Sequence, residues 1–411
     1  MRKLSLYFYF SILICFVSCN HSKVADITID KVSKELAAAT KTYDELYEFH
    51  EGLSKVVKNG KMGFIDKMGN EIIKCQFDDA SDIQYGVAIV KIGEMKGLID
   101  LYGNCVAPCR FDYINSFGSD SLASASMNGK VGVIDITGKT IIPFKYEEVG
   151  CFSEGLAPVR LDGKYGFINR NGDIVIPSNY DELYNGIGFS EGLVGVEKDG
   201  KWGYLDKTGN IVIPFKDGLT GAPFSSGLTT MYRGGISFST DSNGHMEMKE
   251  DPFEMAFVNR NGALASDFFP VQNLEVFRDG YCVVKDKNGW AGLLNTRGDF
   301  TVPCKYSFIA NGFDENFVLI QINHKSGFAR KSTGEIIIPC MYEIDYDGWK
   351  FNEGLIPVKK NGKYGFINED NDVVIPFIYD GTSSFSEGFA VVKKYGKYGF
   401  VDRYGMDTFN N

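Results

Sequence analysis

The sequence predicts an all-β protein made of about ten tandem units, each with three antiparallel strands. One stretch, typified by residues 152–183, recurs with variations over residues 43–411, and this period is the first observation behind the prediction. The second is a set of Asn-Gly and Asp-Gly pairs between short apolar runs, which is typical of hairpins. The third is the composition: 47 glycines and 14% aromatic residues favour strands and turns over helices.

Residues 1–18 are predicted to be a lipoprotein signal peptide. Two basic residues precede an apolar run, residues 4–17, that is too short to cross a bilayer as a permanent helix. The run ends in Phe16-Val17-Ser18-Cys19, which resembles the lipobox of bacterial lipoproteins. We therefore predict that Cys19 is lipidated after cleavage. The alternative is an ordinary cleaved signal with Cys19 as a bystander.

Acyl chains on Cys19 would hold the protein on a membrane face without a spanning helix. We therefore expect a lipid-anchored protein of the bacterial cell envelope, at the outer membrane and on its periplasmic or surface face. Residues 19–42 are expected to tether the repeats to this anchor. Within them, the Ala-rich residues 34–39 favour a short helix.

Two apolar runs in each unit are predicted to form a hairpin. In the typical unit, residues 156–160 and 164–168 flank Asp162-Gly163. A type I′ turn needs positive φ at both of its central residues, which Asn-Gly and Asp-Gly supply. The same pair recurs as Asn59-Gly60, Asn128-Gly129, Asp199-Gly200 and Asn361-Gly362.

A third strand follows a second kind of turn. That turn has Asp or Asn at its first position and Gly at its fourth, as from Asp66 to Gly69, so a side-chain oxygen caps it. The strand is Ile174-Val175-Ile176 in the typical unit, and it stops at Pro177, which cannot donate to a ladder. A sheet of three such strands is too small to be stable alone, so each unit must pack on its neighbours.

A glycine stands inside the aromatic strand of nearly every unit. A glycine weakens a strand unless another group must approach closely there. We expect an aromatic ring to cover it, and the phenylalanine of the recurring Phe-x-Glu-Gly segment is the first choice. The glycines are Gly63, Gly97, Gly132, Gly166, Gly203, Gly292, Gly327, Gly365 and Gly399.

The size of the unit favours an open, curved or superhelical array, similar to a solenoid, over a closed ring like a β-propeller. Propeller blades usually hold four strands in about 40 to 50 residues, and ten blades exceed the common number. An insertion at about residues 234–253 interrupts the array.

The repeat resembles that of the WG or KWG repeat proteins of bacteria. Their signature is Gly-Lys-Trp-Gly-Tyr-Ile-Asp, followed by a turn, Val-Ile-Pro and Tyr-Asp. One copy here is Gly200-Lys201-Trp202-Gly203-Tyr204-Leu205-Asp206, and the likeness covers roughly residues 43–405. The resemblance implies a tandem all-β fold in an exported or membrane-associated protein. It implies no catalytic residues, no enzymatic activity and no cofactor.

The charge argues against a nucleic-acid partner. The formal net charge is −10, and it becomes −12 once Arg2 and Lys3 leave with the signal. A phosphate backbone needs a stripe of lysine or arginine, and no such stripe interrupts this acidic balance.

The recurring polar residues are predicted to be structural. A carboxylate in every unit is more often a hydrogen-bond acceptor than a catalyst, because an active site is a single constellation. Cysteines that alternate with phenylalanine mark a packing position, and the histidines show no metal-ligand spacing. The carboxylates are Glu51, Glu154, Glu191, Glu353 and Glu387, the cysteines are Cys75, Cys109, Cys304 and Cys340, and the histidines are His21, His50, His245 and His324.

The insertion contains a partial calcium-loop pattern. Ser239, Asp241 and Asn243 alternate ahead of Gly244, and Glu250 closes the series, as in an EF-hand loop. The first ligand position lacks its usual aspartate, and no flanking helix is evident. Asp241, Asn243 and Glu250 are therefore the candidate metal ligands, and the alternative is an extended hairpin with an Asn-Gly turn.

The sequence favours a non-enzymatic envelope lipoprotein whose repeat surface binds another protein or a cell-envelope polymer. One alternative is a glycan-binding accessory protein or a carbohydrate-active enzyme, because sugar rings stack on exposed aromatic faces. Another is a passive structural spacer. The aromatic residues that lie in variable connectors, and so are the candidate ligand contacts, are Tyr184, Tyr232, Tyr346 and Trp349.

Overall fold

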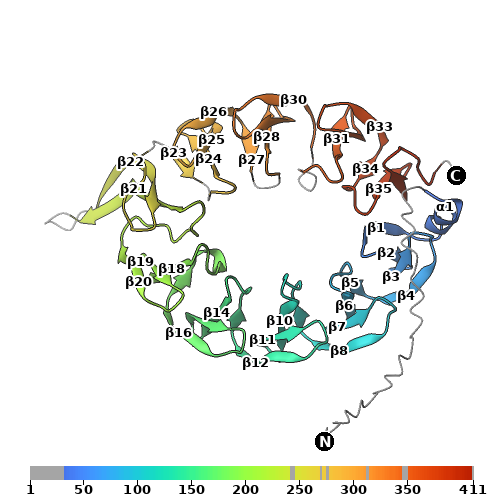
Figure 1. Ribbon diagram of the computed structural model, residues 1–411, viewed down its shortest axis with the longest axis horizontal. Coiled ribbons are helices and arrows are strands. Elements are labelled where there is room, and N and C mark those ends of the chain that lie inside the picture. Colours follow the sequence, from blue (N-terminus) through green and yellow to red (C-terminus); the bar gives the residue numbers. More distant parts are fainter. Residues whose placement is uncertain are drawn as a thin grey trace, which may run out of the picture.

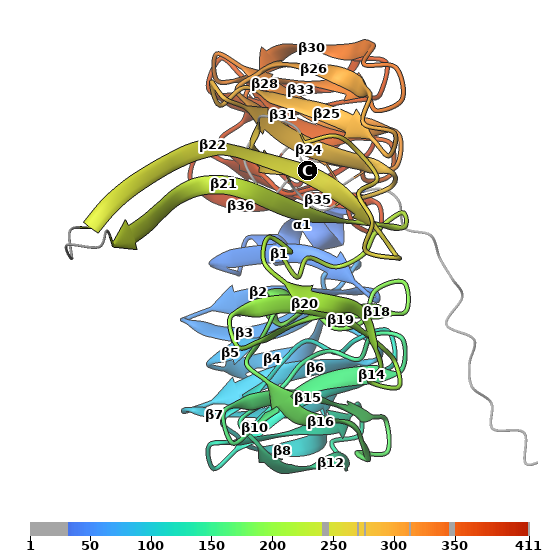
Figure 2. The same ribbon diagram turned by 90° about the vertical axis from the view of Figure 1, so that its left-hand side faces the viewer.

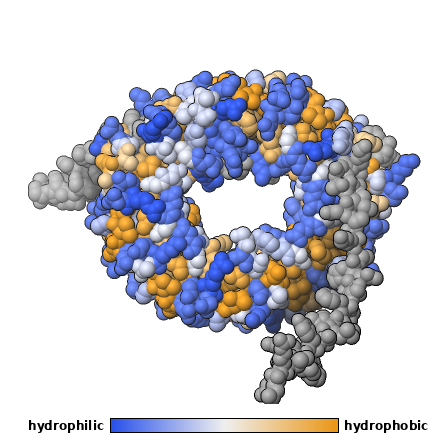
Figure 3. All heavy atoms as spheres, viewed as in Figure 1, coloured by the Kyte–Doolittle hydropathy of each residue, from blue (hydrophilic) through white to orange (hydrophobic). Residues whose placement is uncertain are grey.

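The protein forms a ring of ten small antiparallel sheets around a central opening (Figures 1 and 3). The computed structural model describes residues 32–240, 246–268, 271–274, 277–311, 314–344 and 350–409. Each sheet is one repeat unit, and its strands follow one another outward from the opening in chain order. The predicted all-β fold of tandem antiparallel units is confirmed. We number the units one to ten along the chain.

Most units have a fourth, innermost strand that the sequence did not predict. It is often only two residues long, which is too short for an alternation of apolar and polar residues to reveal it. The innermost strands are β1 (Glu45–His50), β5 (Asp79–Ala80), β9 (Tyr113–Ile114), β13 (Glu148–Val149), β17 (Glu182–Leu183), β23 (Val271–Leu274), β27 (Phe308–Ala310) and β34 (Gly381–Thr382).

The predicted hairpin forms the middle of each sheet. In unit four, Asp162 and Gly163 have φ of 52° and 75°, as a type I′ turn requires. The first hairpin strands are β2 (Leu53–Lys58), β6 (Val87–Ile92), β10 (Leu122–Met127), β14 (Leu156–Leu161), β18 (Leu193–Lys198), β21 (Leu228–Thr240), β24 (Tyr281–Asp286), β28 (Phe317–Ile322), β31 (Ile356–Lys360) and β35 (Phe389–Lys394). The second are β3 (Lys61–Asp66), β7 (Met95–Asp100), β11 (Lys130–Asp135), β15 (Lys164–Asn169), β19 (Lys201–Asp206), β22 (Met246–Asn259), β25 (Ala291–Asn295), β29 (Lys325–Arg330), β32 (Lys363–Ile367) and β36 (Lys397–Asp402).

The outermost strand bulges over the strand glycine. In unit four, Tyr165 pairs with Tyr180 and Phe167 with Ile176, so three residues of the outer strand lie opposite Gly166 alone. A Cβ on Gly166 would lie 2.6 Å from the Ile176 carbonyl oxygen. The outermost strands are β4 (Glu71–Phe77), β8 (Cys105–Phe111), β12 (Thr140–Tyr146), β16 (Ile174–Tyr180), β20 (Ile211–Lys216), β26 (Phe300–Tyr306), β30 (Ile336–Tyr342) and β33 (Val373–Tyr379).

The prediction that an aromatic ring covers the glycine is confirmed in several units, but the ring comes from the outer strand and not from Phe-x-Glu-Gly. A Cβ on Gly203 would lie 2.9 Å from the Phe215 ring, and one on Gly365 would lie 3.0 Å from the Phe377 ring. At Gly166 the nearest atoms are backbone of the bulge. The phenylalanine of Phe-x-Glu-Gly packs one residue further along, on the aromatic ring that follows the glycine in the preceding unit. Phe189 meets Phe167 in this way, edge to face, with ring centroids 5.0 Å apart.

The hydrophobic core is divided among the interfaces between adjacent units. One cluster joins Phe167 and Ile176 of unit four to Val196 and Leu205 of unit five, and all four side chains are buried. Each cluster of buried residues in the described part of the chain draws on two adjacent units, as expected for repeats that stack.

The first and last units close the ring. Phe49 of unit one packs against Phe400 of unit ten with ring centroids 4.9 Å apart. The Ser386 hydroxyl donates to the Phe49 carbonyl oxygen at 2.6 Å. The expectation of an open array is therefore wrong, and the alternative, a closed ring like a propeller, is correct. The expectation of an open array rested on units of three strands. The innermost strand gives most units the four strands of a propeller blade.

A helix completes the closure. The predicted tether helix is present as α1 (Lys34–Thr40), capped by the Ser33 hydroxyl, and it lies beside β36 of unit ten (Figure 1). In several other units the turn after the second hairpin strand lies against the outer strand of the preceding unit, so that a Cβ on Gly172 would lie 3.3 Å from Ile142. In unit one the equivalent Gly69 contacts Ala39 of α1. The helix thus meets unit one as the outer strand of a preceding unit would, while Asp407 and Thr408 pair with β36 in unit ten.

The insertion lengthens the hairpin of unit six. Strands β21 and β22 pair from Leu228 opposite Asn259 to Thr240 opposite Met246, and Figure 2 shows them extending beyond the ring. The candidate ligands Asp241 and Asn243 lie outside the described residues, as does the side chain of Glu250. In the part of the chain that is described, no helix has the length and apolarity needed to cross a membrane.

We predict that Gly166→Ala destabilises the protein by about 1–3 kcal/mol, because the added methyl overpacks the bulge. Thermal melting followed by circular dichroism measures the effect. Gly381→Ala is the matched control, since its Cβ would meet nothing nearer than the Lys393 Cβ at 3.6 Å. An unchanged melting temperature in Gly166→Ala would contradict the bulge.

We also predict that Leu36→Ala loosens the closure. Leu36 is fully buried among residues of units one and ten, so its truncation should cost about 2–5 kcal/mol. Hydrogen exchange should then quicken in β1 and β36. Leu205→Ala, equally buried but in unit five, should leave exchange at the closure unchanged. Equal exchange in the two variants would show that α1 does not hold the ring shut.

Candidate binding site

The recurring glutamates hold neighbouring units together. Glu51 of unit one accepts hydrogen bonds from the backbone N–H groups of Tyr85 (2.7 Å) and Gly86 (2.8 Å) in unit two. Glu387 of unit ten accepts one from Gly52 (3.0 Å), across the closure. Glu154, Glu191 and Glu353 bond in the same way to Gly192, Gly227 and Gly388.

Basic residues reinforce these contacts. The Lys207 ammonium lies 2.9 Å from Glu154, and that of Lys67 lies 3.1 Å from Glu387. Burial pushes the pKa of Glu154 upward, but Lys207 and the Gly192 N–H outweigh it and hold this pKa below its ordinary value. The glutamates are thus engaged in packing, as the sequence predicted. We call the face of the ring that carries these turns the glutamate-turn face.

The turn aspartates are structural as well. Asp206 accepts hydrogen bonds from the Thr208 hydroxyl (2.7 Å) and from the Asn210 N–H (2.9 Å). The Thr208 hydroxyl, together with the Asn210 groups, lowers the pKa of Asp206 to about 2.

The cysteines at the phenylalanine position pack partly buried against the core. Burial raises the pKa of the Cys75 and Cys109 thiols, so both are poor nucleophiles near neutral pH. The same holds for Cys304 and Cys340. Among the described residues, no three His, Cys, Asp or Glu side chains are grouped as metal ligands.

The candidate aromatic contacts are not brought into one described cleft. Tyr184 begins the short 3-10 helix η1 (Tyr184–Gly186) in unit five and is half-buried. Tyr232 is 42% exposed on β21 of unit six. Tyr346 and Trp349 lie outside the described residues. A shared role for these four side chains stays a prediction.

Residues that break the repeat gather around a cavity of about 370 Å³ between units one, two and three. The Lys55 ammonium lies 3.3 Å from Asp82, and Asp82 lies 3.7 Å from the Nε2 atom of His50. Lys55 is only 12% exposed and also faces the Tyr47 ring, 4.4 Å from its centroid. Three charged or titratable groups of two units thus converge on one cavity.

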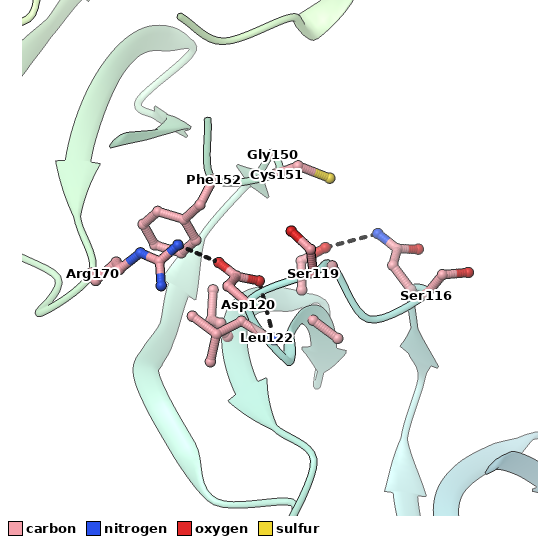
Figure 4. A pocket seen from close by; sticks show the side chains of 13 residues that line it. Ser116, Ser119, Asp120, Leu122, Gly150, Cys151, Phe152 and Arg170 are labelled. Atoms are coloured by element: carbon pink, nitrogen blue, oxygen red, sulfur yellow. Dashed lines mark hydrogen bonds and ion pairs between the residues drawn. The ribbon is translucent and has the colours of Figure 1, made fainter. Parts of the chain in front are cut away.

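A second cavity of about 180 Å³ lies between units three and four (Figure 4). Here four residues separate Phe117 from Leu122, whereas three separate Phe152 from Leu156 in the regular unit. The extra residue gives a longer inner loop. Asp120 of this loop takes the place of the recurring glutamate and pairs with Arg170 at 3.0 Å.

The two cavities are adjacent, because Ser116 lines both. We call them together the polar arc. Its lining is rich in hydroxyl and amide groups, and it includes the ring of Phe152, which has the Arg170 guanidinium 5.7 Å from its centroid. The neutral polar side chains are Ser81, Gln84, Asn115, Ser116, Ser119 and Ser124.

The polar arc was not predicted from the sequence, although one signal marks it. Lys55 is the only charged residue at its position on the first hairpin strand. The equivalent residues are Ile89, Ser124, Pro158, Gly195, Thr230, Val283, Leu319, Pro357 and Val391.

The chain belongs to the family of proteins with the WG containing repeat. This repeat matches the chain nine times over more than half of its length, from residue 38 to residue 216 and again from residue 292 to residue 398. The resemblance stated from the sequence is therefore confirmed for the repeat and the fold. A comparison with curated proteins found no match.

Solved structures that are similar share little sequence with the chain. A eukaryotic initiation factor is 9% identical, with a TM-score of 0.42 over 72% of this chain and 87% of its own. BamB from Moraxella catarrhalis is 12% identical, with a TM-score of 0.32 over 87% and 96%. Hsv2 from Kluyveromyces marxianus is 12% identical, with a TM-score of 0.30 over 62% and 92%. At these scores the likenesses carry no argument about function.

We predict that Asp206→Asn flattens the acid dependence of stability. Because the pKa of Asp206 falls from 3.8 to about 2 on folding, its ionised form stabilises the protein above pH 3.8, and this stabilisation is lost as the pH falls toward 2. Asn169 makes the same turn in unit four, so the variant keeps the backbone contacts. Wild type should melt higher than the variant at pH 5, and the difference should vanish by about pH 2. A constant difference would contradict the assignment.

Proposed function

We propose that the protein is a non-enzymatic, lipid-anchored protein of the bacterial cell envelope that binds a partner protein or an envelope polymer. The observation that supports this most is that the repeated and the unrepeated polar residues make different contacts. The repeated carboxylates bond to neighbouring units, whereas His50, Lys55 and Asp82, which form no repeated contact, converge on the first cavity of the polar arc. A surface that departs from the repeat in one sector is the kind of surface that binds one partner selectively.

The proposal places the binding surface on the glutamate-turn face of units one to four. Two ion pairs lie there, one between Lys55 and Asp82 and one between Arg170 and Asp120. Because these side chains are already held in place, they lose less conformational freedom on binding than a mobile loop would. The recurring units behind them serve as a rigid frame. A ring that served only as a spacer would need no such sector.

The first test is capture of a partner from the native envelope. A photo-crosslinking residue placed at Ser116 of the full-length chain should trap a protein or polymer, and the same residue placed at Asp199, on the hairpin turn of unit five, should not. Equal capture from both sites would contradict the polar arc as the binding surface. Capture from neither would favour the passive spacer.

The second test addresses the anchor. The full-length chain should fractionate with membranes and label with a fatty-acid analogue, whereas Cys19→Ala should lose both properties. Retention of the label in Cys19→Ala would contradict lipidation at this residue. Capture at Ser116 is scored separately, so the anchor and the binding surface are tested independently.

A further inference from the structure

We propose that the ligand of the polar arc is a neutral oligosaccharide chain that spans both cavities. This inference rests on the proposed binding function and narrows it to one class of envelope polymer. It is drawn from three properties of the arc: its charge balance, its lining groups and its continuity.

The charge balance argues against a strongly charged ligand. In the first cavity the Lys55 ammonium is already paired with Asp82, and in the second the Arg170 guanidinium is paired with Asp120. A charged ligand would have to break one of these pairs and leave the other partner uncompensated, which is costly in a partly buried site. Asp120 also accepts the Leu122 N–H at 3.3 Å, which holds it further in place. A neutral ligand leaves both pairs intact.

The lining groups suit a polyhydroxylated ligand. Serine hydroxyls and the Asn and Gln amides offer both donors and acceptors, which is the complement that sugar hydroxyls require. The Asn115 amide already donates to the Ser124 hydroxyl at 2.8 Å, so part of this network is held before any ligand arrives. Figure 4 shows Phe152 beside Arg170 at the edge of the second cavity, where a C–H face of a sugar ring would find apolar surface.

The continuity of the arc requires a ligand with length. Neither cavity is large, at about 370 and 180 Å³, but Ser116 lines both. One sugar ring fills only one cavity, whereas a chain of several rings contacts both. The chain gains binding free energy at the second cavity without a second loss of translational entropy. A hexasaccharide should therefore bind more tightly than its monomer.

The test is isothermal titration of the detergent-extracted full-length chain with cellohexaose, maltohexaose and chitohexaose. We expect one of these neutral hexasaccharides to bind with a Kd at least tenfold lower than that of its monosaccharide. Ser116→Tyr, which fills the junction of the cavities, should weaken the binding at least tenfold. The control is Ser384→Tyr, the same change at the equivalent position of unit ten, which should leave the binding unchanged.

Three results would overturn the inference. They are failure of all three hexasaccharides to bind, equal binding by wild type and Ser116→Tyr, and tighter binding of a basic peptide or a sulfated glycan than of any neutral sugar. If the hexasaccharides fail but Ser116 still crosslinks to a partner in the envelope, the proposed binding function stands and only the oligosaccharide is excluded. A thermal melt of Ser116→Tyr that matches wild type shows that loss of binding is not loss of fold.

Discussion

The hydrogen bond that a glutamate carboxylate accepts from the next unit's turn is the contact on which the closure of the ring depends. The turn places Glu51 and Gly52 at φ of 50° and 82°, which exposes N–H groups that have no strand partner. At five junctions a glutamate of the preceding unit accepts one of these N–H groups and so completes the turn of its neighbour. One of the five is the closure, where Glu387 accepts the Gly52 N–H. The contact that joins successive units therefore also joins the two ends of the chain.

Most local structure of a unit could be predicted from its turn residues, because a turn type is specified within a few residues. Asp162-Gly163 fixes a backbone state wherever it stands. The prediction that the strand stops at Pro177 is wrong, because β16 continues to Tyr180 and Pro177 lies in the bulge opposite Gly166, where no ladder hydrogen bond is needed from it. The innermost strand at Asp79–Ala80 could not be predicted, since two residues carry no period. Closure could not be predicted either, because it depends on ten small rotations adding to a full turn, and no single residue encodes that sum.

The polar arc illustrates a similar limit for the site. Ser116 is an ordinary serine in a connector, and only the packing of three units makes it the junction of two cavities. Lys55 was detectable in principle, because alignment of the units shows a charge where all others are neutral. The recurring glutamates carry a group that could act in catalysis, but their repetition predicted a structural role. Their hydrogen bonds to neighbouring units confirm that role.

The helix that stands in for an outer strand has a consequence for synthesis. Residues 34–40 emerge among the first, but their partner, β36, is made more than 350 residues later. At typical rates of translation, about 5–20 residues per second, β36 is synthesised on the order of tens of seconds after α1. During that interval Leu36 has its partners in unit one, such as Val56, but lacks Phe389 and Phe400 of unit ten. We expect the nascent chain to rely on a chaperone until unit ten is complete.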